Sequence, residues 1–228
     1  MNREIECLIE RYYQVQEHRI AMGNQVLQLR KAGEEVNPLE DYYKRFYEIE
    51  KDIAKYLGKA MKDHKMWVWL KKVKGIGPIL ASALLVTIDI RKAQHASSVW
   101  KYAGLAPGQR REKGKKLDFN PFLKVICWKI GESFVKTKGE YRNVYDSAKA
   151  FYQQKFPFPV QKTDKKGKPM LDKDGKPLLM YTKKHLHNMA KRKAVKLFLS
   201  HFWAEWRKEE SLPVSEPYAH RGLANAVE

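Results

Sequence analysis

Two glycines, Gly75 and Gly77, stand within the segment VKGIGPILASALL, residues 73–85. One apolar residue separates them, and a run of apolar and small residues follows, which is typical of a helix-hairpin-helix motif. We expect both glycines to adopt positive φ and to turn the chain tightly into the second helix. The first amides of that helix have no helical acceptor and lie at its positive end, so the chemistry predicted here is binding of a phosphate oxygen.

Basic residues surround this turn and recur in the loop GQRREKGKKLD, residues 108–118. Contacts of this kind would hold the nucleic-acid backbone and would not read base sequence. The plainer alternative is a glycine turn between two buried helices beside a solvated basic surface. The candidate phosphate-binding residues are Lys71, Lys72, Lys74, Gly75, Ile76, Gly77, Arg110, Arg111, Lys113, Lys115, Lys116, Lys124, Lys184, Lys191 and Arg192.

Charge is divided unevenly along the chain, which has a net charge of +19. Residues 1–65 contain 12 basic and 12 acidic residues, whereas residues 66–228 contain 33 basic and 14 acidic residues. This asymmetry predicts one neutral region and one region that meets a polyanion. Nucleic acid is the expected partner, DNA before RNA, because each neutralised phosphate releases counterions.

Two heptad patterns precede the basic region and predict a helical hairpin. In the first, over residues 3–32, the apolar positions are Ile5, Leu8, Tyr12, Val15, Met22, Val26 and Leu29, with Arg19 at a position where the pattern expects an apolar residue. In the second, they are Leu39, Tyr42, Phe46, Ile49, Ile53, Tyr56 and Ala60. The seam could close within one hairpin or between chains, as in a homodimer or a larger homo-oligomer.

The remaining patterns indicate further helices, so we predict an all-α protein. One helix should begin at Asn120-Pro121, a second should span 141–155, and a third should run from Thr182 to about residue 210. Between the last two, residues 157–181 contain the repeated sequences TDKKGKPML and DKDGKPLLM, which predict a β-hairpin or a basic loop. The expected domains are a coiled-coil hairpin over 1–65, a basic helix-hairpin-helix domain over 66–210 and a flexible tail over 211–228.

Several classes of protein are disfavoured by the sequence. Cys7 and Cys127 form neither a metal-ligand spacing nor a disulfide framework, so no metal and no cofactor are expected. No run of eighteen apolar residues predicts a membrane span, and the first residues lack the apolar stretch of a signal peptide. We therefore expect a cytoplasmic protein. The acidic residues of the basic region are scattered along the sequence, so no catalytic residue is predicted, although they could still cluster in space.

Three segments together resemble a known family: VKGIGPILASALLVTID (residues 73–89), WKYAGLAP (100–107) and NPFLK (120–124). They are similar to the C-terminal domain of the insertion-sequence one-ten family of bridge-RNA-guided transposases. The resemblance is good over about residues 66–135, and the heptad helices are similar to that family's oligomerising coiled coil. The resemblance implies a nucleic-acid-holding scaffold and self-assembly.

The same resemblance exposes two departures from the family. The family carries an N-terminal resolvase-like domain with acidic metal ligands, which these residues do not include. It also places a serine nucleophile in the loop after the YAGL segment, near Arg111–Lys113 here, where no hydroxyl group stands. We therefore expect a DNA-binding protein without catalysis of its own, acting on branched or bent DNA. The alternatives are a recombinase or nuclease with a relocated active site, and a module that binds structured RNA.

Overall fold

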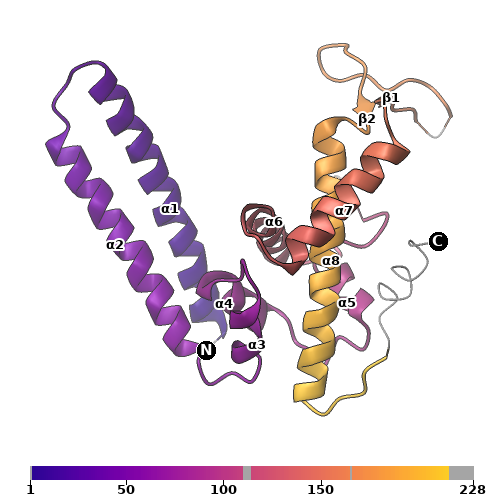
Figure 1. Cartoon of the computed structure of the whole chain (residues 1–228), viewed down its shortest axis with the longest axis horizontal. Coiled ribbons are helices and arrows are strands. Elements are labelled where there is room, and N and C mark those ends of the chain that lie inside the picture. Colours follow the sequence, from indigo (N-terminus) through magenta and orange to yellow (C-terminus); the bar gives the residue numbers. More distant parts are fainter. Residues whose placement is uncertain (1, 110–113, 165, 216–228) are drawn as a thin grey trace. The chain divides into compact units, whose positions relative to one another are not determined.

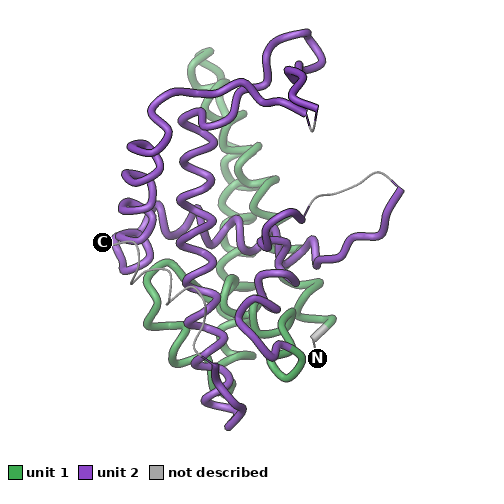
Figure 2. The backbone as a smooth tube through the Cα atoms, turned by 90° about the vertical axis from the view of Figure 1, so that its right-hand side faces the viewer, with its two compact units in different colours: residues 1–92 green, residues 93–228 purple. Residues whose placement is uncertain are grey.

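The computed structural model describes residues 2–109, 114–164 and 166–215. These residues form eight α-helices and one two-stranded sheet, which confirms the predicted all-α class. They divide into two compact units, residues 1–92 and residues 93–228 (Figure 2). Each unit has its own buried core and is described in turn.

The N-terminal unit is built on two long antiparallel helices, α1 (Asn2–Lys31) and α2 (Asn37–Ala60), as Figure 1 shows. The chain leaves α1 through Gly33, whose φ is +80°, a conformation that glycine adopts without strain at a helix end. Pro38 then occupies the start of α2, where its missing N–H removes no helical hydrogen bond. The predicted N-terminal helical hairpin is therefore confirmed.

A charged pair lies in the seam of this hairpin, at the position where Arg19 interrupts the heptad pattern. Its guanidinium forms an ion pair with Glu50 of α2, which is 6% exposed. Gln16 Nε2 donates to Glu50 Oε2 (3.4 Å), and Arg19 Nη1 donates to the Tyr43 hydroxyl (3.4 Å). Buried pairs of this kind add little stability, but a polar seam residue can disfavour other registers. At the Arg19–Glu50 pair, the seam is therefore formed between α1 and α2 of the same chain.

Two shorter helices, α3 (Trp67–Lys72) and α4 (Pro78–Thr87), complete the N-terminal unit. Ile79 and every residue of α4 from Ala81 to Thr87 are buried, and α4 packs against α1, α2 and α3. An all-round apolar helix needs this central position. Because α4 shares a core with the helix pair, the compact division falls after Lys92, whereas the charge distribution suggested a boundary after residue 65.

The C-terminal unit is organised around its longest helix, α8 (Lys183–Glu209). Three helices pack against it: α5 (Ala96–Tyr102), α6 (Pro121–Lys136) and α7 (Glu140–Lys155). As predicted, α6 begins at Asn120, whose side-chain oxygen accepts the N–H of Leu123 (3.0 Å). This cap satisfies one of the donors left open at the start of the helix.

Aromatic residues of α8 fill the core of the C-terminal unit. Phe198, Phe202 and Trp203 are fully buried, and the rings of Phe134 and Phe198 pack edge to face with centroids 5.4 Å apart. The indole Nε1 of Trp203 donates to the carbonyl of Ala93 (2.7 Å), so the buried donor has a partner. The aromatic end of α8 is therefore a structural core and not a binding surface.

The repeated segment before α8 forms a short hairpin. Strand β1 (Val160–Gln161) pairs antiparallel with β2 (Leu179–Met180) at its base. Beyond the strands, Asp164 Oδ1 accepts the N–H groups of Lys166 (2.8 Å) and Lys168 (2.9 Å). Asp172 makes the same two bonds eight residues later, with the N–H groups of residues 174 and 176. Each copy of the repeat thus folds as its own aspartate-stapled turn.

Candidate nucleic-acid interface

The glycine turn between α3 and α4 uses its two glycines differently. Gly75 has a φ of +99°, as expected, and a side chain there would strain the backbone. Gly77 has a φ of −87° and a ψ of 177°, so the prediction of positive φ was wrong at this position. Gly77 is instead the N-cap of α4, an extended conformation that other residues also adopt.

The start of α4 is open at Gly77. Its first helical residue is Pro78, and the N-cap makes no side-chain hydrogen bond. The earliest intrahelical acceptor, Gly77 O, receives the N–H of Ala81 (3.0 Å), so the amides of Ile79 and Leu80 precede the first helical bond. A Cβ placed on Gly77 would meet no atom within 4 Å. Among the described residues, the position that a side chain would take at this N-cap is therefore open.

Lysines flank this turn on its N-terminal side. Lys71 and Lys72 form the last turn of α3, Lys74 follows, and all three are exposed. Ile76 is different because its side chain is buried, at 7% exposed, and only its backbone can meet a ligand. In the N-terminal unit, then, the predicted residues form one continuous group with exposed cations around a helix start.

A second group lies in the C-terminal unit, in the basic loop after α5. Arg110, Arg111 and Lys113 lie outside the described residues, and so does the position where the family places its serine. Lys115 and Lys116 are exposed and help to line a cavity of about 590 Å³. The sequence analysis missed a third cation in its lining, Lys101.

Gln109 fastens the base of this loop. Its Oε1 accepts the N–H of Ala106 (3.1 Å), and its Nε2 donates to Lys101 O (3.1 Å) and Asp118 Oδ2 (3.2 Å). A single amide therefore joins both ends of the loop to α5. The pattern analysis did not single out this glutamine, because a lone polar residue carries no periodic signal.

The YAGL and NPFLK segments pack against each other. Asn120 donates its N–H to Tyr102 O (2.8 Å) and its side-chain amide to the Tyr102 hydroxyl (2.9 Å). Gly104 has a φ of +66°, and a Cβ there would come within 2.8 Å of the Phe119 ring. A glycine is therefore required at this point, which gives a physical reason for the spacing of the two motifs.

The predicted cations of α6 and α8 have unequal exposure. Lys184 and Arg192 are exposed, but Lys191 is 7% exposed and forms an ion pair with Glu132. The hydrogen bond from Lys191 lowers the pKa of the Glu132 carboxyl. Lys191 therefore has a carboxylate partner within its own unit.

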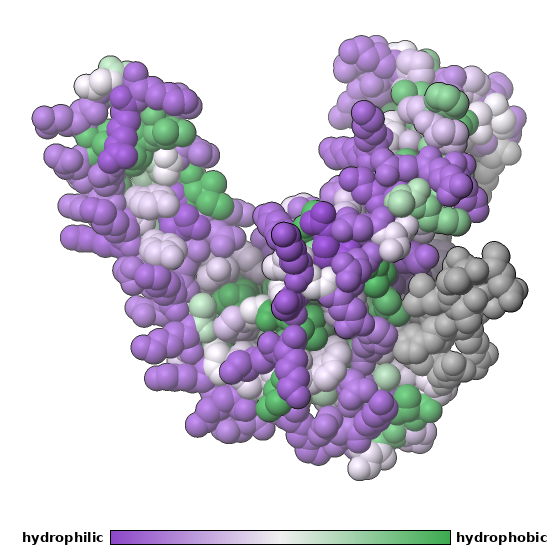
Figure 3. Space-filling view, in the orientation of Figure 1, coloured by the Kyte–Doolittle hydropathy of each residue, from purple (hydrophilic) through white to green (hydrophobic). Residues whose placement is uncertain are grey.

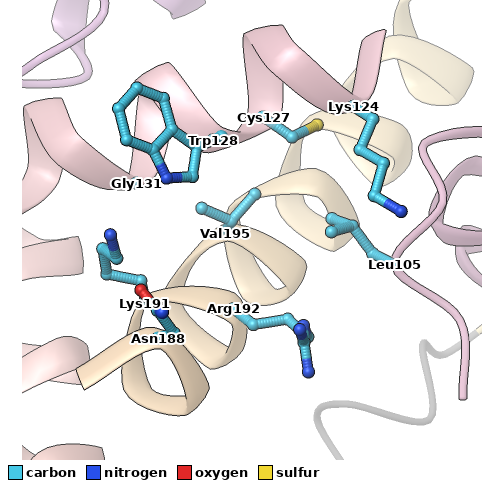
Figure 4. A pocket seen from close by; sticks show the side chains of 9 residues that line it. All are labelled: Leu105, Lys124, Cys127, Trp128, Gly131, Asn188, Lys191, Arg192 and Val195. Atoms are coloured by element: carbon cyan, nitrogen blue, oxygen red, sulfur yellow. The ribbon is translucent and has the colours of Figure 1, made fainter. Parts of the chain in front are cut away.

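A cavity of about 230 Å³ lies between α6 and α8 and brings together three of the predicted residues, Lys124, Lys191 and Arg192 (Figure 4). Trp128, which the sequence analysis did not select, is 58% exposed in its lining. The other lining residues are Leu105, Cys127, Gly131, Asn188 and Val195. Trp128 lies outside the apolar stripe of α6, and this position does not by itself predict a cavity.

Other candidate reactive groups have structural partners or are buried. Burial raises the pKa of the Cys127 thiol to about 12, so this sulfur is protonated and a poor nucleophile at neutral pH. His185 Nδ1 accepts the N–H of Tyr181 (2.9 Å), and His187 Nδ1 lies 2.7 Å from the Tyr145 hydroxyl. Among the described residues, no three His, Cys, Asp or Glu side chains are grouped to hold a metal ion. None of the described helices combines the length and the apolar composition of a membrane span.

An all-α fold with an open helix start, a glycine turn and exposed cations defines a scaffold suited to phosphate binding. Residues 69–116 match the family model described as Transposase IS116/IS110/IS902 family, consistent with a C-terminal transposase-like domain. The match confirms the resemblance, supports a transposase-related function and implies interaction with nucleic acid. No curated protein and no solved structure matches the chain.

Proposed function

We propose that this protein binds DNA along the phosphate backbone, through the start of α4 and the exposed cations, without cutting the strand. The observation that carries the proposal is the open helix start at Gly77, beside Lys71, Lys72 and Lys74. It lies within the segment that matches the transposase family.

Two interactions that attract a phosphate coincide at the start of α4. Amides at the start of a helix point outward and carry the positive end of the helix dipole, which favours a phosphate oxygen. Nearby lysines add charge without requiring a particular base. The unfilled space at Gly77 supports close approach of an anion to the amides of Ile79 and Leu80. Such binding would be strong at low salt and tolerant of sequence.

The absence of strand cleavage is proposed from the side chains of the basic loop. Residues 108–118 contain no serine, threonine or tyrosine that could form a covalent bond with a phosphate. A lysine ammonium group donates hydrogen bonds to a phosphate but has no lone pair with which to attack it. A preference for branched or bent DNA is part of the proposal and is supported by the family resemblance.

The test compares binding to a duplex, a four-way junction, a single strand and a structured RNA of equal length, at one fixed salt concentration. Magnesium or manganese is included, and the labelled strands are then examined for nicks. We expect tight binding to duplex or junction with all strands intact. Preference for RNA would favour the RNA-binding alternative. Stoichiometric nicking that Asp89→Asn or Asp118→Asn abolishes would favour a nuclease or recombinase.

A prediction that separates folding from binding concerns Gly77→Ala. The variant should fold normally, because its φ of −87° suits alanine and the new Cβ meets nothing within 4 Å. It should nevertheless weaken DNA binding roughly 10- to 100-fold, the effect of disturbing charged hydrogen bonds at the helix start. Thermal unfolding followed by circular dichroism and a DNA titration measure the two properties separately.

Two other glycine substitutions serve as controls for this prediction. Gly58→Ala in α2 adds a methyl group at ordinary contact distance, 3.8 Å from Pro78 and Trp67, and should leave DNA binding unchanged. Gly75→Ala should lower stability as well as affinity, because its φ of +99° strains alanine. Full affinity in Gly77→Ala would argue against phosphate contact at the start of α4.

A further inference from the structure

We propose that the cavity between α6 and α8 receives one unpaired base of the bound DNA, which stacks on Trp128. This inference rests on the proposed function, since it names how the bound nucleic acid is held at a second place. It concerns only the C-terminal unit and does not depend on the glycine turn.

Trp128 is unusual among the residues of α6 because its large apolar ring is 58% exposed. Ile126, Ile130 and Phe134 of the same helix are each at most 1% exposed, so the core does not require the indole. An exposed indole beside cations is suited to base stacking, which needs a rigid aromatic face and accepts any base. The ring is thus available for a ligand.

The indole is also held in place. Lys191 Nζ lies 5.5 Å from the centroid of the Trp128 ring, within the range of a cation–π contact. Lys191 is in turn fixed by its ion pair with Glu132, so three side chains from two helices support one another. A ligand would meet a ring that is already ordered, which reduces the entropy lost on binding.

The size of the cavity suits a single ring system. Its volume of about 230 Å³ is below the roughly 300–1,000 Å³ typical of pockets for drug-sized ligands. Leu105 and Val195 give it apolar walls, and Gly131 lets the helices approach closely, since a Cβ there would lie 3.3 Å from Val195 Cγ2. Asn188 adds an amide that can both donate to and accept from the polar edge of a base.

The charge of the lining matches a polyanion. The nine lining residues include three cations and no carboxylate, and Figure 4 shows that the cations come from both α6 and α8. Lys191 is already paired with Glu132, which leaves Lys124 and Arg192 to meet the phosphates on either side of an inserted base. An uncharged apolar ligand would gain nothing from these two side chains.

The experiment compares a perfect duplex with the same duplex carrying one unpaired 2-aminopurine, using the full chain and the variants Trp128→Ala, Trp128→Phe and Phe158→Ala. We expect wild type to prefer the bulged duplex and to quench the probe. Trp128→Ala should bind the bulged duplex roughly 5- to 150-fold more weakly, with unchanged affinity for the perfect duplex. Trp128→Phe should keep part of the preference, and Phe158→Ala, which removes a ring 77% exposed outside the cavity, should keep all of it.

The outcomes separate this inference from the proposed function. Equal affinity of wild type for both duplexes, or full preference in Trp128→Ala, would overturn the base-binding cavity and leave backbone binding intact. Loss of the preference in Phe158→Ala as well would also overturn it. Failure to bind either duplex would overturn the proposed function, and this inference with it. Thermal unfolding checks that each variant keeps the wild-type fold.

Discussion

Affinity for duplex DNA is expected to fall by about 10³–10⁵-fold when salt rises from roughly 50 to 200 mM. The cause is counterion release, and this magnitude corresponds to roughly six to ten neutralised phosphates. Residues 66–228 supply enough cations for this number, with 33 basic residues against 14 acidic residues. Fluorescence anisotropy titrations at several salt concentrations give the slope of log affinity against log salt.

Neutralising the basic loop should flatten that slope. With Arg110, Arg111, Lys113, Lys115 and Lys116 all changed to alanine, the slope should fall by about 0.9 for each phosphate that the variant no longer neutralises. A matched control changes five exposed cations of the helix pair to alanine: Arg11, Lys44, Lys51, Lys55 and Lys59. The control should keep the wild-type slope. If both variants lowered the slope equally, the salt dependence of binding would follow the total charge of the chain and not the basic loop.

The second large effect concerns assembly. Exposed hydrophobic residues recur every seven positions on the helix pair, at Ile20 and Leu27 of α1 and at Tyr42, Ile49 and Tyr56 of α2. Figure 3 shows hydrophobic residues interrupting the hydrophilic surface of these helices. Such spacing is typical of a coiled-coil contact. We therefore predict at least a dimer through residues 3–62, with twice the 26.8 kDa mass of one chain.

Negative charge placed among these exposed hydrophobic residues should separate the two chains of the dimer. The double variant Ile20→Glu, Ile49→Glu should have the mass of one chain by light scattering at micromolar concentration, while circular dichroism shows its helices retained. Both positions are exposed, so glutamate costs little within the chain. Leu171→Glu, an exposed site in the C-terminal unit, controls for added charge and should stay dimeric. A monomeric wild type would contradict the prediction.

Regular periodicity made most of the fold predictable from the sequence. The heptads of α1 and α2, the Asn120 cap of α6 and the span of α8 each leave a local pattern that one sequence reveals. Even the interruption at Arg19 was visible, although only the structure supplies its partner, Glu50. That partner is distant in sequence, and no pattern links the two residues.

The site was less predictable because it depends on conformation and burial. Gly75 and Gly77 are the same residue type, yet only Gly75 needs a positive φ. Lys191 belongs to a basic run, but the fold buries it against Glu132. Trp128 had no periodic role and therefore no signal. The sequence shows how many charged residues and glycines the chain has, whereas packing decides which of them are exposed to a ligand.

The burial of α4 links recognition to folding. The amides proposed to hold a phosphate belong to a helix whose body is the core of the N-terminal unit, not to a mobile loop. A ligand that binds only the folded form adds its binding free energy to that of folding, about 2.7 kcal/mol at a concentration of 100 times Kd. The melting temperature of the helix pair should therefore rise as DNA is added, although the proposed contacts include no residue of α1 or α2. By the same linkage, a cavity in the core beneath α4 would weaken DNA binding from a distance once it left a sizeable fraction of the chain unfolded.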